Sequence, residues 1–163
     1  MINSNQSSIR PSLNKFLIRA IIGVSLIGVA DTLYLILNSL YGDKVKCLLV
    51  GGCETVLTSK FSIFAGIPLS WWGLVFYVSV FLVINLFDIY SSRKWLKLLG
   101  LMSVAGFLVS VSLLYIQIFE IKALCFYCLT SFTTSTIIFI LTLVLTQKYK
   151  RADNSNESVA GLS

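Results

Sequence analysis

Three long stretches of this chain contain no charged residue, and their length is the strongest constraint on the fold. They run from Leu69 to Phe87, from Leu98 to Phe119 and from Ala123 to Thr146. A helix that crosses a bilayer needs about 20 mostly apolar residues, because a rise of ~1.5 Å per residue must cover ~30 Å of hydrocarbon. None of the stretches shows the alternation that is typical of outer-membrane β-strands. Each therefore predicts a transmembrane helix.

A fourth apolar stretch, about residues 16–40, has Arg19 near its start and Asp31 inside it. It is too long for the apolar region of a signal peptide, and no small-x-small cleavage motif ends it. We therefore expect an all-α integral membrane protein, a four-transmembrane-helix bundle. The expected parts are a disordered cytoplasmic tail (1–15), four spans (about 16–40, 69–87, 98–119 and 123–146), an outer loop (41–68) and a second cytoplasmic tail (147–163).

The composition agrees with this fold and excludes several functions. The chain is 56% hydrophobic and 12% charged, whereas a soluble domain is about 25% charged. The net charge of +6 comes from short basic clusters between the apolar stretches, which gives no basic-aromatic groove for nucleic acid. Because the chain has no histidine, a His general base, a Cys–His pair and His-ligated metal or haem are excluded.

The basic residues also predict the orientation. Nine lie on one side of the expected spans and four on the other, and cytoplasmic loops carry the excess of Lys and Arg. The nine are Arg10, Lys15, Arg19, Arg93, Lys94, Lys97, Lys148, Lys150 and Arg151, and the four are Lys44, Lys46, Lys60 and Lys122. We expect a multi-pass protein of the inner (plasma) membrane, with both termini cytoplasmic. All four cysteines would then lie at the outer face, where disulfides persist.

The outer loop carries Cys47 and Cys53, with two glycines just before Cys53. Its mixture of apolar and polar residues between Glu54 and Ala65 predicts a short amphipathic helix at the membrane interface. We interpret the loop as a lid over the outer mouth of the bundle. The alternative is a plain connector that packs its apolar residues on lipid.

The other two cysteines, Cys125 and Cys128, form a Cys-x-x-Cys pair at the start of the fourth span. A helix N-terminus lowers a cysteine pKa, and the thiolate is the species that attacks a disulfide. The spacing puts both sulfurs on one face. We expect Cys125 to be the more exposed and Cys128 to lie ~4.5 Å deeper along the axis.

These pairs predict an enzyme that relays electrons. An outside dithiol reduces the pair Cys47/Cys53, which reduces Cys125/Cys128, which needs an acceptor at membrane depth, a lipid quinone. The alternative is a non-catalytic bundle with two structural disulfides or a four-thiolate zinc site.

Three polar residues near the expected site have open roles. Asp31 either shapes an internal polar site or is satisfied by a hydrogen bond to a neighbour, and an ionisable group at this depth is costly in either case. Gln117 and Glu120, near the end of the third span, are better placed to face the cysteines.

The order of these motifs resembles the vitamin K epoxide reductase family in its bacterial form, over about residues 16–146. The residues that carry the resemblance are Gly-Gly-Cys53, Ser59, the run Gly66-Ile67-Pro68-Leu69-Ser70 and the run Cys125-Phe126-Tyr127-Cys128. Animal members have a tyrosine at the position of Phe132, so plain quinone reduction is expected here rather than epoxide reduction.

The resemblance implies a four-helix bundle around a quinone of the menaquinone, ubiquinone or phylloquinone type. It implies that Cys128 contacts the quinone, that Cys125 exchanges with Cys53, and that Ser59 helps to hold the lid. It also implies that Cys47 receives electrons from a thioredoxin-fold dithiol protein. The residues after Gln147 are polar and few, so we expect no fused thioredoxin domain and a separate periplasmic or extracytoplasmic partner.

Overall fold

The computed structural model describes residues 5–41, 55–56, 62–90 and 92–160. Its long helices are α1 (Asn5–Tyr41), α3 (Leu69–Tyr90), α4 (Arg93–Ile116) and α5 (Phe126–Ala160). A two-stranded sheet of β1 (Ile63–Phe64) and β2 (Ile67–Pro68) precedes α3, and a π-helical turn, η2 (Gln117–Ile121), follows α4. The described chain is thus an all-helical bundle with one small hairpin, as the apolar stretches predict.

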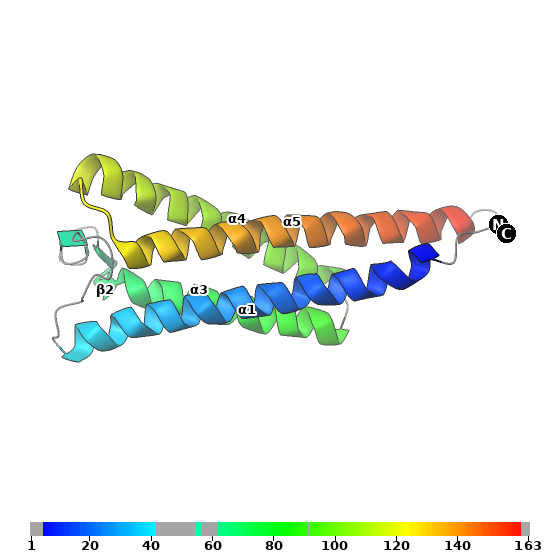
Figure 1. The fold of residues 1–163 in the computed structure, drawn as a ribbon, viewed down its shortest axis with the longest axis horizontal. Coiled ribbons are helices and arrows are strands. Elements are labelled where there is room, and N and C mark those ends of the chain that lie inside the picture. The colour runs from blue at the N-terminus through cyan, green and yellow to red at the C-terminus, as the bar shows by residue number, and fades with distance from the viewer. Residues whose placement is uncertain (1–4, 42–54, 57–61, 91, 161–163) are drawn as a thin grey trace.

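Four helices of the described chain are long and apolar enough to cross a membrane, which confirms the four-span prediction. These candidate spans are Lys15–Tyr41, Leu69–Tyr90, Arg93–Ile121 and Phe126–Arg151. The helix α1 packs against α3 and α5, and α4 also packs against α3 and α5. The start of α1 and the end of α5 lie at one end of the bundle (Figure 1). The hairpin and the start of α5 lie at the other end, which we name the hairpin end.

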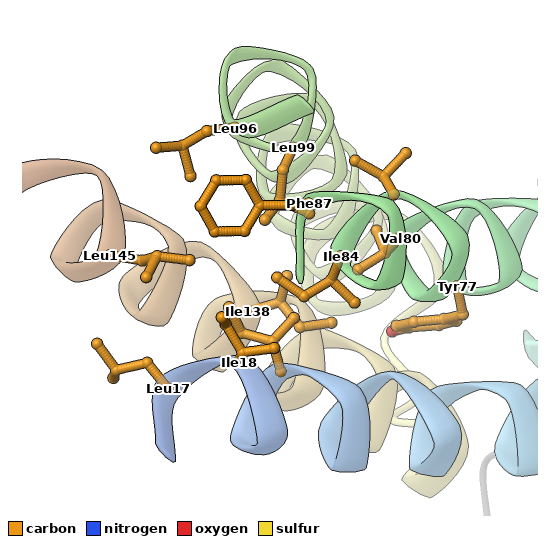
Figure 2. Close-up of a cluster of buried hydrophobic side chains, with 12 residues drawn as sticks. Leu17, Ile18, Tyr77, Val80, Ile84, Phe87, Leu96, Leu99, Ile138 and Leu145 are labelled. Atoms are coloured by element: carbon orange, nitrogen blue, oxygen red, sulfur yellow. The ribbon is translucent and has the colours of Figure 1, made fainter. Parts of the chain in front are cut away.

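Apolar side chains from all four helices form the core (Figure 2). Ile21 of α1, Ile84 of α3, Leu99 of α4 and Ile138 of α5 are each 0% exposed. Outward-facing leucines and valines on the same helices are exposed, as expected where lipid replaces water as the solvent. The bundle is therefore held by a narrow apolar seam.

Two segments differ from the sequence prediction. The helix α1 begins at Asn5, so residues 5–15 are helical where a disordered tail was expected. The end of the expected amphipathic helix is β-structure instead: Phe64 pairs with Ile67, and Ala65 and Gly66 between them have φ of 53° and 80°. Two successive residues with positive φ close a tight hairpin, and a helix cannot continue through them. The rest of that expected helix, apart from Thr55, Val56 and Ser62, lies outside the described residues.

Candidate active site at the hairpin end

The Cys-x-x-Cys pair lies where α5 begins, and Cys125 is the residue that caps this helix. Its carbonyl accepts the first helical hydrogen bond, from the Leu129 N–H at 3.0 Å. Its sulfur accepts the backbone N–H groups of Tyr127 and Cys128, which are the groups that an N-cap side chain satisfies. Both thiols are free. The predicted position of the pair at the helix start is confirmed.

This position favours the thiolate of Cys125, which immediately precedes the transmembrane part of α5. A hydrogen bond from the Cys128 thiol lowers the pKa of Cys125 to about 7, although burial opposes the shift. The backbone N–H groups of the first turn contribute in the same direction. Cys125 therefore loses its proton more easily than an ordinary cysteine does, and Cys128 supports it as a donor.

The expected order of exposure is wrong. Cys125 is 0% exposed, whereas Cys128 is only partly buried. Cys125 and Val56 form a small apolar cluster, against which Ile121 and Phe126 pack. Val56 comes from the expected outer loop, so a residue that is distant in the chain helps to cover the first cysteine. A sequence offers no signal for this contact.

Gln117 holds the two cysteines from the end of α4. Its side chain is 4% exposed, its Oε1 accepts the Cys125 N–H at 3.2 Å, and its amide also hydrogen-bonds the Cys128 thiol. The helix widens at this point into η2, and Lys122 ends it with a left-handed φ of 53°. The Gln117 carbonyl then accepts the N–H of Ala123 at 3.3 Å.

Of the two polar residues that the sequence placed near the cysteines, only Gln117 reaches them. Glu120 is exposed.

The helix α1 supplies the opposite wall of the site. Tyr34 stacks on Tyr127, with ring centroids 5.1 Å apart and an angle of 28° between the planes. Asp31, one turn earlier on α1, interacts electrostatically with Cys125 and Cys128. Its Oδ2 atom is buried, and no described residue hydrogen-bonds it. Among the described residues, no neighbour satisfies this oxygen, which favours the alternative that Asp31 shapes an internal polar site.

A second polar cluster, which the sequence analysis missed, lies one turn further along α5. The Tyr77 hydroxyl from α3 shares hydrogen bonds with the hydroxyls of Ser131 and Thr134, both at 2.8 Å, and with that of Ser135 at 3.3 Å. Ser110 of α4 also donates to Ser135 at 3.0 Å. The available signal was the group of Ser and Thr residues at 130–136 within an otherwise apolar stretch.

The expected outer-loop residues Cys47, Cys53 and Ser59 lie outside the described residues. Their roles in the relay and in the lid therefore stay predictions.

The comparison with known families agrees with the arrangement of the site. The model of the vitamin K epoxide reductase family matches residues 19–143, which is well over half of the chain. The matched segment contains Asp31, Tyr77, Gln117 and both cysteines of the pair. No curated protein matches the chain. From the extent of the family match, the chain belongs to the vitamin K epoxide reductase family.

Proposed function

We propose that this protein oxidises a dithiol on a separate thioredoxin-fold protein and passes the electrons to a lipid quinone, which supports disulfide bond formation. The family consists of membrane thiol oxidoreductases that use quinones. The observation that carries the proposal is the free Cys125–Cys128 pair, which the N-terminus of α5 and Gln117 hold in hydrogen-bonding contact.

The residues present fit a quinone near Cys128. Cys128 is only partly buried at the start of a transmembrane helix, and the buried Oδ2 of Asp31 on the facing helix has no hydrogen-bond partner among the described residues. Cys128 would contact the bound molecule, and Asp31 would supply a polar group beside it. A bound quinone of the menaquinone, ubiquinone or phylloquinone type would accept two electrons and two protons.

The disulfide steps follow from the chemistry of the cysteines. The partner dithiol reduces the Cys47–Cys53 disulfide and becomes a disulfide itself. The Cys53 thiolate attacks the Cys125 sulfur of the oxidised pair, which forms a Cys53–Cys125 disulfide and releases Cys128. Cys47 then attacks Cys53 and releases Cys125. A thiol with a lower pKa leaves faster, so the helix cap on Cys125 assists this last release.

The orientation is part of the proposal: both termini are cytoplasmic, and the cysteines face the outer compartment. The nine-to-four distribution of basic residues supports it. The start of α1 and the end of α5 also share the end of the bundle opposite the pair (Figure 1). A membrane-impermeant thiol reagent should therefore label reduced Cys47 in intact cells. Labelling that appears only after permeabilisation would contradict this orientation.

The deciding experiment uses purified protein, a reduced thioredoxin-fold dithiol protein and a quinone analogue whose absorbance changes on reduction. Wild-type protein should reduce the quinone. Cys53→Ala should lose the activity that the protein partner drives but keep the activity that dithiothreitol drives, because a small reductant can reach the inner pair directly. A protein that reduces no quinone with either reductant and holds stoichiometric zinc would instead be the non-catalytic bundle.

A second variant separates the roles of the two inner cysteines. Cys128→Ala should abolish quinone reduction with either reductant, because Cys125 can no longer form a disulfide with residue 128. The Cys125 thiolate can then attack only the Cys53 sulfur of the Cys47–Cys53 disulfide, which forms a Cys53–Cys125 disulfide and releases Cys47 as a thiol that alkylation can block. Gel mobility without reductant reports this bond, and Cys125→Ala serves as its control. If Cys128→Ala shows no Cys53–Cys125 disulfide and Cys125→Ala instead traps Cys53 on Cys128, the two roles are reversed.

A further inference from the structure

The carboxyl group of Asp31 is a polar feature of the site that the disulfide chemistry does not use. It lies within a candidate span, where an ionisable side chain is costly. Its Oδ2 is buried and has no hydrogen-bond partner among the described residues. Buried polar atoms are nearly always paired, so an unpaired one calls for an explanation. A group held in this state is available for a molecule or a proton that binds there.

Contacts on both sides of Asp31 fix the level at which it faces α5. Tyr34, one turn toward the hairpin end, stacks on Tyr127 of α5. Gly28, one turn in the other direction, lies against the Tyr77 ring, and the Tyr77 hydroxyl bonds Ser131 of α5. Residues three apart lie on the same side of a helix. Asp31 therefore faces the turn of α5 between residues 127 and 131, which contains Cys128.

The electrostatics agree with this placement. In the part of the chain that the structure describes, the titratable groups on other segments that interact with Asp31 are Cys125, before α5, and Cys128 and Tyr127, on α5. Tyr34 is the titratable neighbour on its own helix. From α3, the hydroxyl of Tyr77 is already occupied by hydroxyl groups of α5. Both sulfurs of the pair are thus within the electrostatic reach of one carboxyl group.

We propose that Asp31 is the proton carrier of the pair: it takes the thiol proton of Cys128 as the Cys125–Cys128 disulfide forms and gives it to an oxygen of the quinone. This inference rests on the proposed function. The step balances, because the Cys125 thiolate and the Cys128 thiol lose two electrons and one proton and form one S–S bond. The quinone gains those two electrons, the proton that Asp31 carries and a second proton from water, and becomes the quinol.

The test separates the two half-reactions of the full-length protein in detergent. Prereduced protein is mixed with excess quinone analogue, quenched with a thiol-labelling reagent and scored for oxidised Cys125–Cys128. Asp31→Asn should slow this oxidation by about 10²-fold, in the range of a lost general acid or base. Asp31→Glu should restore most of the rate. Dithiothreitol should reduce the oxidised pair equally fast in wild type and Asp31→Asn.

A measurement without quinone tests whether Asp31 lies close to the cysteine pair. The charge of Asp31 raises the pKa of Cys125, so Asp31→Asn should move the pH midpoint of Cys125 alkylation downward, and Asp31→Glu should leave it in place. The matched control is Asp88→Asn, because Asp88 is exposed at the far end of α3. This variant should change neither the rate at which quinone oxidises the pair nor the pH midpoint of Cys125 alkylation.

The possible failures are distinguishable. A wild-type protein that no quinone oxidises would refute the proposed function. A wild type that is oxidised while Asp31→Asn matches it in rate would refute only the role of Asp31. Equal slowing of oxidation by quinone and of reduction by dithiothreitol would also overturn the inference, because a purely structural defect affects both.

Discussion

Two polar clusters lie one helical turn apart on α5, and they differ in how completely their groups are satisfied. The hydroxyl of Tyr77 reaches Ser131 and Thr134 and rests in a core that leaves the Tyr77 side chain 1% exposed. At the hairpin end, one oxygen of Asp31 has no partner among the described residues, and the helix before the pair widens into a π-helical turn. Both clusters are polar, but only the second contains reactive thiols.

The physical reason for the difference is the membrane. Polar groups at this depth have no water to bind, so structural ones must be satisfied within the protein. Thr130 and Thr134 follow this rule by donating to the carbonyls four residues earlier, at 3.1 and 3.0 Å. An arrangement that leaves a carboxyl oxygen unsatisfied costs stability. We interpret the Tyr77 cluster as a structural clamp and the Asp31–Cys128 region as the reactive end.

The largest expected effect is a loss of stability when the structural clamp around Tyr77 is disturbed. A Cβ atom at Gly28 would overlap the Tyr77 ring, and the hydrogen bonds of the Tyr77 hydroxyl prevent the ring from moving aside. Gly28→Ala should therefore lower the free energy of unfolding by about 1–3 kcal/mol, the usual range for overpacking. The control is Gly23→Ala on the same helix, where a Cβ would meet nothing within 4 Å. Denaturation in detergent with sodium dodecyl sulfate measures both, and equal stability of the two variants would contradict the clamp.

The next effect tests the hydroxyl alone. Tyr77→Phe keeps the ring but removes the group that joins α3 to α5. This variant should lower the free energy of unfolding by about 1.5 kcal/mol, near the upper end of what interhelical hydrogen bonds contribute in membranes. The rate at which dithiothreitol reduces the oxidised pair should stay unchanged in the folded fraction. If dithiothreitol reduced the pair more slowly in this variant while the stability stayed unchanged, the two clusters would act as one site.

A smaller effect is expected at Gln117, because it contacts the pair without reacting. Gln117→Leu removes the acceptor of the Cys125 N–H and the hydrogen bond to Cys128. We expect thiol–disulfide exchange to slow about three- to tenfold, which corresponds to the ~1 kcal/mol of one hydrogen bond. Gln117→Glu keeps an acceptor oxygen and should recover part of the rate. Exposed Glu120 offers the control Glu120→Leu, which should leave exchange unaffected.

The sequence was sufficient for the architecture because a bilayer restricts the choices. Apolar runs of sufficient length predict spanning helices without knowledge of their contacts, and all four appear. The pair at the start of α5 was also predictable, since a polar break precedes Cys125 and an apolar stretch follows it. The positive φ at Ala65 could not be predicted, because alanine rarely adopts this conformation and nothing about the residue type indicates it.

Long-range contacts account for the rest of what was missed. Tyr77 and Ser131 are 54 residues apart in the chain, and nothing in the sequence pairs them. The burial of Cys125 depends on Val56, which comes from a different segment. The direction of Asp31 depends on how α1 packs on α5. Helix existence is encoded locally, but the face that each helix turns inward is decided by packing.

The smallest expected effect is a shift in the titration of Cys125, and it tests whether the two thiols act as a unit. The hydrogen bond from Cys128 is the main reason that the pKa of Cys125 is lowered to about 7. Because only the thiolate is alkylated, the reaction of reduced Cys125 with iodoacetamide should rise with pH through a midpoint near that value. Cys128→Ala removes the donor, so the midpoint should move upward, although the backbone N–H groups at positions 127 and 128 still hold it below that of an ordinary cysteine. Cys128→Ser keeps a donor and should leave the midpoint near 7. Mass spectrometry of the peptide that contains Cys125 gives the modified fraction at each pH. If the Ala and Ser variants titrate alike, the helix N-terminus alone sets the acidity of Cys125, and Cys128 serves only as the second electron carrier.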